Sequence, residues 1–134
     1  MSDVLDRLVA KHKDFTEEVG LDLMAEEESP EFGGSACLKY SNGVVSLMVT
    51  KSRDGISYYC ADGEWRGENW YSMDIIWNHL KQNVEYRKMK GVGHFSFFQD
   101  NFAQIDAIFR SSEKEQTASA LRSLELSRSK KLFG

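Results

Sequence analysis

The sequence predicts an α+β protein that forms a single domain over residues 1–134. We expect an antiparallel β-meander of three to four strands, with an N-terminal helix and two to three C-terminal helices packed on it. Three β-branched and aromatic runs at 36–41, 44–51 and 56–61 are separated by turns that contain Asn42-Gly43 and Asp54-Gly55. Such turns indicate hairpins, because glycine adopts the positive φ of a tight turn without a Cβ clash. Helical periodicity on either side of these runs is the second observation.

The N-terminal segment has the apolar period of an amphipathic helix that ends at Gly20. Its stripe comprises Val4, Leu5, Leu8, Val9, His12, Phe15 and Val19. Residues 21–25 alternate briefly and allow a short edge strand. The acidic run at 26–28, followed by Ser29-Pro30-Glu31 and Gly33-Gly34, predicts an exposed loop that leads into the sheet.

Three further stretches after the meander have helical spacing. The first begins at Ser72, with an apolar stripe of Met73, Ile76, Trp77, Leu80 and Val84, and ends before Gly91. The second contains Phe98, Phe102, Ile105 and Phe109, and the third follows a capping box of Ser112 and Glu115. Whether Ser111-Ser112 interrupts one long helix stays open at this point.

Length and composition favour a compact cytoplasmic protein. A chain of 134 residues can bury roughly two-thirds of the surface that it exposes when unfolded. We expect a cytoplasmic location because no secretory-type signal is seen, and no apolar run is long enough to cross a membrane. Cys37 and Cys60 are then expected to be thiols, although adjacent strands would make a disulfide geometrically conceivable.

Charge is distributed unevenly along the chain. Residues 1–35 carry a net charge of −7, residues 36–80 carry −1 and residues 81–134 carry +4. An acidic surface repels nucleic acid and favours a basic partner, whose encounter it can accelerate. An acidic loop and a basic helix that complement each other within the molecule would give the same counts.

The segment from Glu64 to Tyr71 places large aromatic residues among charges. Tryptophan and tyrosine provide large contact areas with few rotatable bonds, so they are common in binding hot spots. We expect Trp70 and Tyr71 to pack inward and Trp65 to be the exposed anchor.

No catalytic, cofactor or metal signature is found. His12, His79 and His94 lack metal-ligand spacing, and the glycines around Val92 lack the rest of a phosphate-binding motif. We therefore predict a protein that is not an enzyme and needs no cofactor. The enzymatic alternative is a small hydrolase or nuclease that uses His79 or His94, or the two as a pair.

The order of elements and the closing pattern resemble small bacterial immunity proteins. The pattern runs from Asn101-Phe102-Ala103-Gln104-Ile105 to Phe109 and then Leu132-Phe133-Gly134. The nearest resemblance is to immunity proteins of contact-dependent growth inhibition and other polymorphic toxin systems. The resemblance implies a protein that binds a cognate toxin domain, often a nuclease, and occludes its active site or a neighbouring surface.

Charge and aromatic content therefore predict a surface for a basic toxin domain, with nucleic acid and membrane excluded as partners. The residues expected to bind the partner are Glu26, Glu27, Glu28, Glu31, Asp62, Glu64, Trp65, Glu68, Trp70 and Tyr71. A third interpretation is an interaction or regulatory module whose basic C-terminal helix binds an acidic ligand or joins two copies of the chain.

Overall fold

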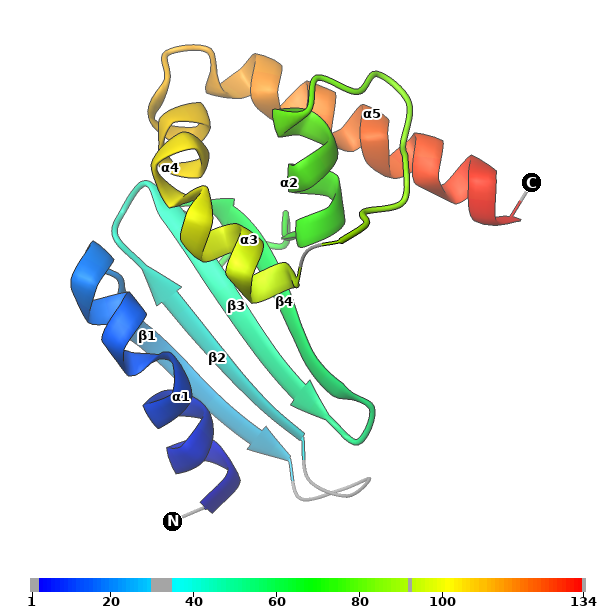
Figure 1. Cartoon of the computed structure of the whole chain (residues 1–134). Coiled ribbons are helices and arrows are strands. Elements are labelled where there is room, and N and C mark those ends of the chain that lie inside the picture. The colour runs from blue at the N-terminus through cyan, green and yellow to red at the C-terminus, as the bar shows by residue number, and fades with distance from the viewer. Residues whose placement is uncertain (1–2, 30–34, 92, 134) are drawn as a thin grey trace. The chain divides into compact units, whose positions relative to one another are not determined.

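The structure is a computed structural model that describes residues 3–29, 35–91 and 93–133 (Figure 1). The described residues form an α+β protein with antiparallel strands, an N-terminal helix and several C-terminal helices, which confirms the predicted class. The chain divides into two compact units, Met1–Trp70 and Tyr71–Gly134. Each unit is described separately below, and the single domain over 1–134 stays a prediction.

The first unit is a helix on an antiparallel sheet. Helix α1 (Asp3–Val19) ends at Gly20, which has a φ of +77°, as the sequence predicts. The strands β1 (Asp22–Ser29), β2 (Ser35–Ser41), β3 (Val45–Ser52) and β4 (Gly55–Asp62) follow in chain order across the sheet. Figure 1 shows α1 along one face of this sheet. The three predicted meander strands are thus confirmed as β2, β3 and β4.

The register places the unit's apolar core under α1. Leu38, Val49 and Tyr58 are cross-strand partners, and Tyr40, Leu47 and Cys60 form a second row on the same face. All six side chains are buried. His12 of α1 bonds to the hydroxyl of Tyr58, which fixes this face as the one that α1 covers.

The opposite face of the sheet is only partly covered. Its central side chains are Cys37, Lys39, Met48, Thr50 and Tyr59, all of intermediate exposure. We call this surface the open face. Side chains alternate between the two faces along a strand. The residues that precede and follow each buried apolar residue in a strand therefore belong to the open face.

The turn between β2 and β3 has the chemistry that the sequence predicts. The side-chain Oδ1 of Asn42 accepts hydrogen bonds from the N–H groups of Val44 at 2.9 Å and Val45 at 2.8 Å. Gly43 has a φ of +89°. The Asn-Gly pair therefore closes this hairpin through the amide of one residue and the positive φ of the other.

The prediction of a loop for the acidic run is wrong. Glu26, Glu27 and Glu28 lie in β1, opposite Leu38, Cys37 and Ala36 of β2. Glutamate has low intrinsic β-propensity, but backbone pairing to a neighbouring strand overrides it, and an edge position keeps the carboxylates in water.

The second unit begins with a two-residue strand and continues as helices. Its elements are β5 (Tyr71–Ser72), α2 (Met73–Leu80), α3 (His94–Asp100), α4 (Phe102–Arg110) and α5 (Lys114–Phe133). Within the unit, α5 packs against α2 and α4, and α3 packs against α2. Buried side chains that serve these contacts include Ile76, Phe98, Ile105, Leu121 and Leu124.

Element counts and boundaries differ from those predicted. The described residues form five strands rather than three to four, and four helices follow them rather than two to three. Helix α2 ends at Leu80, and Gln82 has a φ of +62°, so Val84 lies outside the helix and is 88 % exposed. Asn101 separates α3 from α4 with a non-helical φ of −119°.

The serine turn at 111–112 does interrupt the helix. Ser111 has extended backbone and ends α4, and its hydroxyl accepts a hydrogen bond from the N–H of Glu113 at 3.0 Å. The side-chain hydrogen bond at this turn therefore comes from Ser111, one residue before the Ser112 of the predicted capping box.

Candidate functional site

Strand β1 is the outer strand at one end of the sheet of the first unit. It pairs with β2 on one side only, so its other backbone edge has no neighbouring strand among the described residues. Glu26, Glu27 and Glu28 are exposed, and so are Leu23 at 38 % and Met24 at 43 %. The register shifts between Leu23 and Ala25, which marks an irregularity at Met24. This edge combines apolar and acidic side chains within eight residues.

The acidic side chains lie on both faces of that edge. Glu26 is the partner of Leu38 and therefore lies on the face that α1 covers, whereas Glu27 is the partner of Cys37 on the open face. The pKa of Tyr40 is raised to about 12, chiefly by burial and further by the charge of Glu26. The glutamates thus make the edge strand β1 acidic on both faces of the sheet.

The aromatic segment after β4 is held in place by local hydrogen bonds. Asp62 accepts a bond from the N–H of Glu64 at 2.9 Å, and the indole N–H of Trp70 donates to the carbonyl of Gly67 at 3.1 Å. The guanidinium of Arg66 lies 4.7 Å from the centre of the Trp65 ring. Trp65 and Trp70 are both of intermediate exposure, so each presents part of its ring to solvent.

Lys39 connects the acidic strand to the aromatic segment. Its Nζ lies 6.0 Å from the centre of the Trp70 ring, and its Cα is the partner of Ala25 in β1. Burial raises the pKa of the Cys37 thiol, with Lys39 lowering it and Glu27 raising it, which places these three side chains near one another. The structure therefore brings β1 and Trp70 to the same part of the open face.

Two of the predicted binding residues fall outside this surface. Glu31 lies outside the described residues. Tyr71 opens the second unit and is only 4 % exposed, in agreement with the expectation that it packs inward. Asp62, Glu64 and Glu68 are exposed in the first unit. The candidate surface thus comprises β1 and residues 62–70.

The two cysteines are not neighbours in the sheet. Cys37 lies in β2 and Cys60 in β4, with β3 between them, and their side chains lie on opposite faces. Both are free thiols. Cys60 is fully buried, and burial raises its pKa, whereas Cys37 is partly exposed. Neither is arranged as an activated nucleophile, which needs a lowered pKa.

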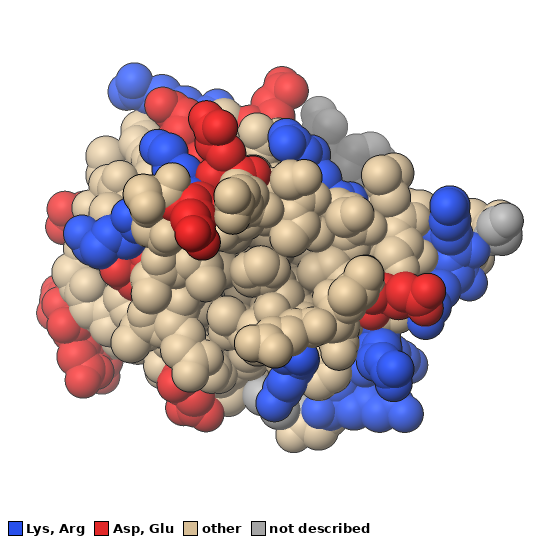
Figure 2. All heavy atoms as spheres, turned by 90° about the horizontal axis from the view of Figure 1, so that it is seen from above, with Lys and Arg blue, Asp and Glu red and all other residues tan. Residues whose placement is uncertain are grey.

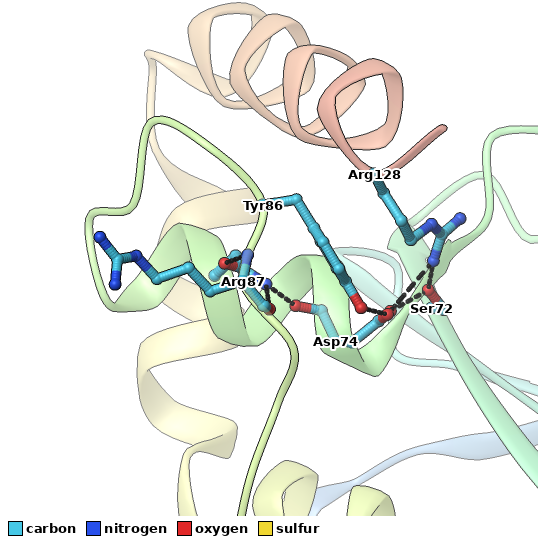
Figure 3. Close-up of polar contacts among 6 residues, drawn as sticks. Ser72, Asp74, Tyr86, Arg87 and Arg128 are labelled. Atoms are coloured by element: carbon cyan, nitrogen blue, oxygen red, sulfur yellow. Dashed lines mark hydrogen bonds and ion pairs between the residues drawn. The ribbon is translucent and has the colours of Figure 1, made fainter. Parts of the chain in front are cut away.

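The second unit contains a polar network that the sequence does not predict (Figure 3). Asp74 lies in the first turn of α2 and accepts hydrogen bonds from Ser72 and from the hydroxyl of Tyr86 at 2.7 Å. Arg128 of α5 donates to Asp74 at 3.1 Å and to Ser72 at 2.7 Å. Burial alone would raise the pKa of Asp74, but the hydrogen bonds from Ser72 and Tyr86 and the charge of Arg128 lower it. Asp74 is therefore an ionised group that joins three segments.

Asn78 holds the segment that follows α2. The Asn78 side chain is fully buried and donates to the carbonyls of Asp74 and Arg87, both at 2.8 Å. It accepts from the N–H of Arg87 at 2.8 Å and from the amide of Asn83 at 2.9 Å. Four bonds satisfy this amide completely, so it fixes the backbone between Asn83 and Arg87 against the helix.

The two histidines of the enzymatic alternative have different surroundings. His79 lies in the last turn of α2 and lines a hollow of about 390 Å³ with Ile108, Glu113 and Thr117. Burial lowers the pKa of His79. His94 is an exposed residue at the start of α3 and does not line this hollow.

Residues 3–29, 35–91 and 93–133 contain no group of three or more His, Cys, Asp or Glu side chains that could hold a metal ion. Within these ranges, none of the helices has the length and apolar character that crossing a membrane requires. Comparison of the chain with protein-family models, with curated proteins and with solved structures finds no match. The geometry and charge of the surfaces of this chain are therefore the guide to its function.

Proposed function

We propose that the protein is a binding protein of the immunity type, which attaches to a basic protein domain and blocks that domain's active site or a surface next to it. The contact surface comprises β1 and the aromatic segment 62–70, and occlusion rather than catalysis is the mode of action. The observation that carries the proposal is the exposed outer strand with glutamates on both of its faces.

Charge supports a basic partner. The first unit carries 14 acidic and 7 basic residues, a net charge of −7, whereas the second unit carries a net charge of +3. A domain that binds nucleic acid needs a basic groove for phosphates, and an acidic surface complements such a groove. Long-range attraction then accelerates association at low ionic strength.

The apolar and aromatic side chains supply contact area beside the charges. Leu23 and Met24 are exposed on β1, and the partly exposed rings of Trp65 and Trp70 lie in the adjoining segment. Interfaces typically place a few such anchors inside a polar rim. Like charges on β1 oppose pairing of this edge with the same edge of a second copy, so the acidic strand favours a partner of opposite charge.

The test is affinity capture from the lysate of the source cell at low and high salt, with the bound proteins identified by mass spectrometry. We expect a basic protein that high salt releases, because the contact is electrostatic. Co-expression of the captured domain with this chain should suppress any toxicity of that domain. A captured protein whose activity is unaffected by the chain would contradict occlusion.

A pair of charge-reversal variants locates the surface. Changing Glu26, Glu27 and Glu28 to lysine should lower the association rate with the captured domain and remove its dependence on salt. The matched control changes three exposed acids of α1, Asp14, Glu17 and Glu18, to lysine, with the same change in net charge. Equal losses in both variants would show that net charge, rather than β1, determines binding.

A further inference from the structure

The large apolar side chains that are exposed in the described residues fall in two places. Leu23 and Met24 belong to β1, and the other four lie in the second unit, at Val84 in the segment after α2 and in α5. Those in α5 are Leu126, Leu132 and Phe133, with exposed fractions of 67 %, 64 % and 86 %. Of these four, Val84 and Leu126 line one hollow, and apolar side chains that share a hollow mark an interaction surface more strongly than scattered single residues do.

Helix α5 has apolar side chains on two opposite faces. Thr117, Leu121 and Leu124 are buried and recur at helical spacing on the inner face. Leu126 follows Leu124 by two positions, a rotation of about 200°, so it lies on the outer face. Lys130 and Phe133 share that outer face because they follow Leu126 by four and seven positions.

The segment that carries Val84 is fixed beside this outer face. The N–H of Tyr86 donates to the hydroxyl of Ser127 in α5 at 2.9 Å, and the hydroxyl of Tyr86 donates to Asp74. Asn78 holds the same segment from the other side through Asn83. Hydrogen bonds hold the chain on both sides of Val84. Val84 therefore lies in an anchored segment, although it is 88 % exposed.

Between the anchored segment and α5 lies a hollow of about 420 Å³. Val84 and Glu85 form one wall, and Ser123, Leu126, Lys130 and Lys131 form the other. We call this hollow the α5 groove. Figure 2 shows basic side chains gathered where α5 ends, so one end of the groove is positively charged.

We propose that the α5 groove binds an acidic amphipathic helix of a partner protein. An apolar side chain of that helix enters the hollow against Leu126 and Val84, and its carboxylates lie beside Lys130 and Lys131. This is a second interaction surface, on the unit of opposite charge to β1, and it does not depend on the function proposed above.

The occupant follows from shape and charge. A hollow with two walls fits the side chains of a helix, which is a common mode of peptide recognition, whereas a bilayer presents a flat surface. The lysines select carboxylates. The chain's own acidic helix α1 already uses Leu8 and Phe15 for its core, so in a second copy the apolar face of that helix is occupied.

The probe is a fluorescein-labelled synthetic helix of leucine and glutamate at helical spacing, titrated into the purified full-length protein. A scrambled peptide of the same composition is the control for charge alone. We expect saturable binding of the helical peptide and weaker binding of the scrambled one. No saturable binding, or equal binding of both peptides, would overturn the proposal.

Two matched pairs of variants assign the binding to the groove. Leu126→Asp should weaken binding by at least about tenfold, because it removes an apolar anchor and adds a negative charge. Leu132→Asp, an equal change on the same helix outside the hollow, should leave binding nearly unchanged. Changing Lys130 and Lys131 to glutamate should abolish binding, whereas the same change at Lys81 and Lys114 should have little effect.

Two further measurements distinguish the other occupants. Sedimentation of the wild-type protein and of Leu126→Asp should show the same oligomeric state. Vesicles that contain phosphatidylserine should bind the two proteins equally or not at all. Dimerisation that depends on Leu126 would assign the groove to a second copy and overturn the proposal. Vesicle binding that depends on Leu126, without peptide binding, would assign it to a lipid surface.

Discussion

The side-chain amide of Asn78 and the backbone of Arg87 form a reciprocal pair of hydrogen bonds, both 2.8 Å long. The Asn78 side chain, which projects from α2, therefore bonds both the N–H and the carbonyl of Arg87, as the backbone of a neighbouring strand residue would. This pair positions the segment that contains Val84 and Glu85, which forms one wall of the α5 groove.

Asn78→Asp should destabilise the protein. A carboxylate can accept the bond from Arg87 but cannot donate to the carbonyls of Asp74 and Arg87, so both carbonyls lose this donor and a charge is placed at a buried position. We expect a loss of about 2 kcal/mol or more in the free energy of unfolding. The measurement is urea denaturation followed by far-ultraviolet circular dichroism.

The control for that variant is Asn69→Asp, which makes the same chemical change at an exposed position. Its free energy of unfolding should stay within about 0.5 kcal/mol of the wild-type value. An Asn78→Asp protein as stable as the control would show that the amide bonds contribute little to the fold.

His12 should make the protein less stable as the pH falls. Its Nδ1 donates to the carbonyl of Leu8 at 2.8 Å, so in the neutral ring its Nε2 accepts from the hydroxyl of Tyr58, also at 2.8 Å. Burial lowers its pKa below the ordinary 6.5. As the pH falls below about 6.5, the unfolded chain binds more protons at His12 than the folded chain does. The free energy of unfolding therefore decreases as the pH falls from there toward the lower pKa of the folded state.

The measurement is the urea midpoint between about pH 7 and pH 5 for the wild type and for His12→Asn. We expect a smaller pH slope in the variant. His79→Asn should reduce the slope separately, because burial lowers the pKa of His79 as well. Identical slopes in the wild type and His12→Asn would exclude His12 as the titrating group.

The two cysteines should differ in reactivity toward a thiol reagent such as iodoacetamide. Cys37 is partly exposed on the open face, and Cys60 is fully buried with a pKa that burial raises. We expect native labelling at Cys37 and labelling of Cys60 only through unfolding, a rate difference of more than about tenfold. Peptide mapping by mass spectrometry measures both rates, and comparable native rates would contradict the assigned burial.

Gly63→Ala should destabilise the first unit. A Cβ at this position would lie 2.0 Å from the carbonyl oxygen of Gly43, so the backbone must shift. We expect a loss of about 1–3 kcal/mol, as for other overpacked sites. The urea midpoint from tryptophan fluorescence measures it. Gly93→Ala is the control, since its nearest contact would be the Ser96 hydroxyl at 3.7 Å, and an equal loss there would contradict the steric explanation.

Local patterns predicted much of the first unit. Apolar spacing placed α1, and Asn42-Gly43 placed the β2–β3 hairpin, because both depend on residues close in the chain. The end of α2 was not predicted, because the apolar spacing continues to Val84 and is typical of a helix. The hydrogen bonds from Asn78 hold the segment that follows α2, and such bonds produce no periodic pattern in the sequence.

The candidate surface was predicted in part. Charge counts and aromatic content identified Glu26, Glu27, Glu28, Trp65 and Trp70, but the acidic run was assigned to a loop. Only pairing with β2 makes it an outer strand, and only the position of Lys39 brings it near Trp70. No periodicity in the sequence indicates that Tyr86 and Arg128 meet at Asp74, since such contacts join residues far apart in the chain.

The α+β class, the hairpin turn at Asn42-Gly43 and the opposite charges of the two ends of the chain follow from the amino-acid sequence, because they depend on composition and on neighbouring residues. The placement of the glutamates on an outer strand and of the lysines beside the α5 groove depends on the folded arrangement. Those properties arise when distant segments pair and pack, and their free energies belong to contacts that no local pattern contains.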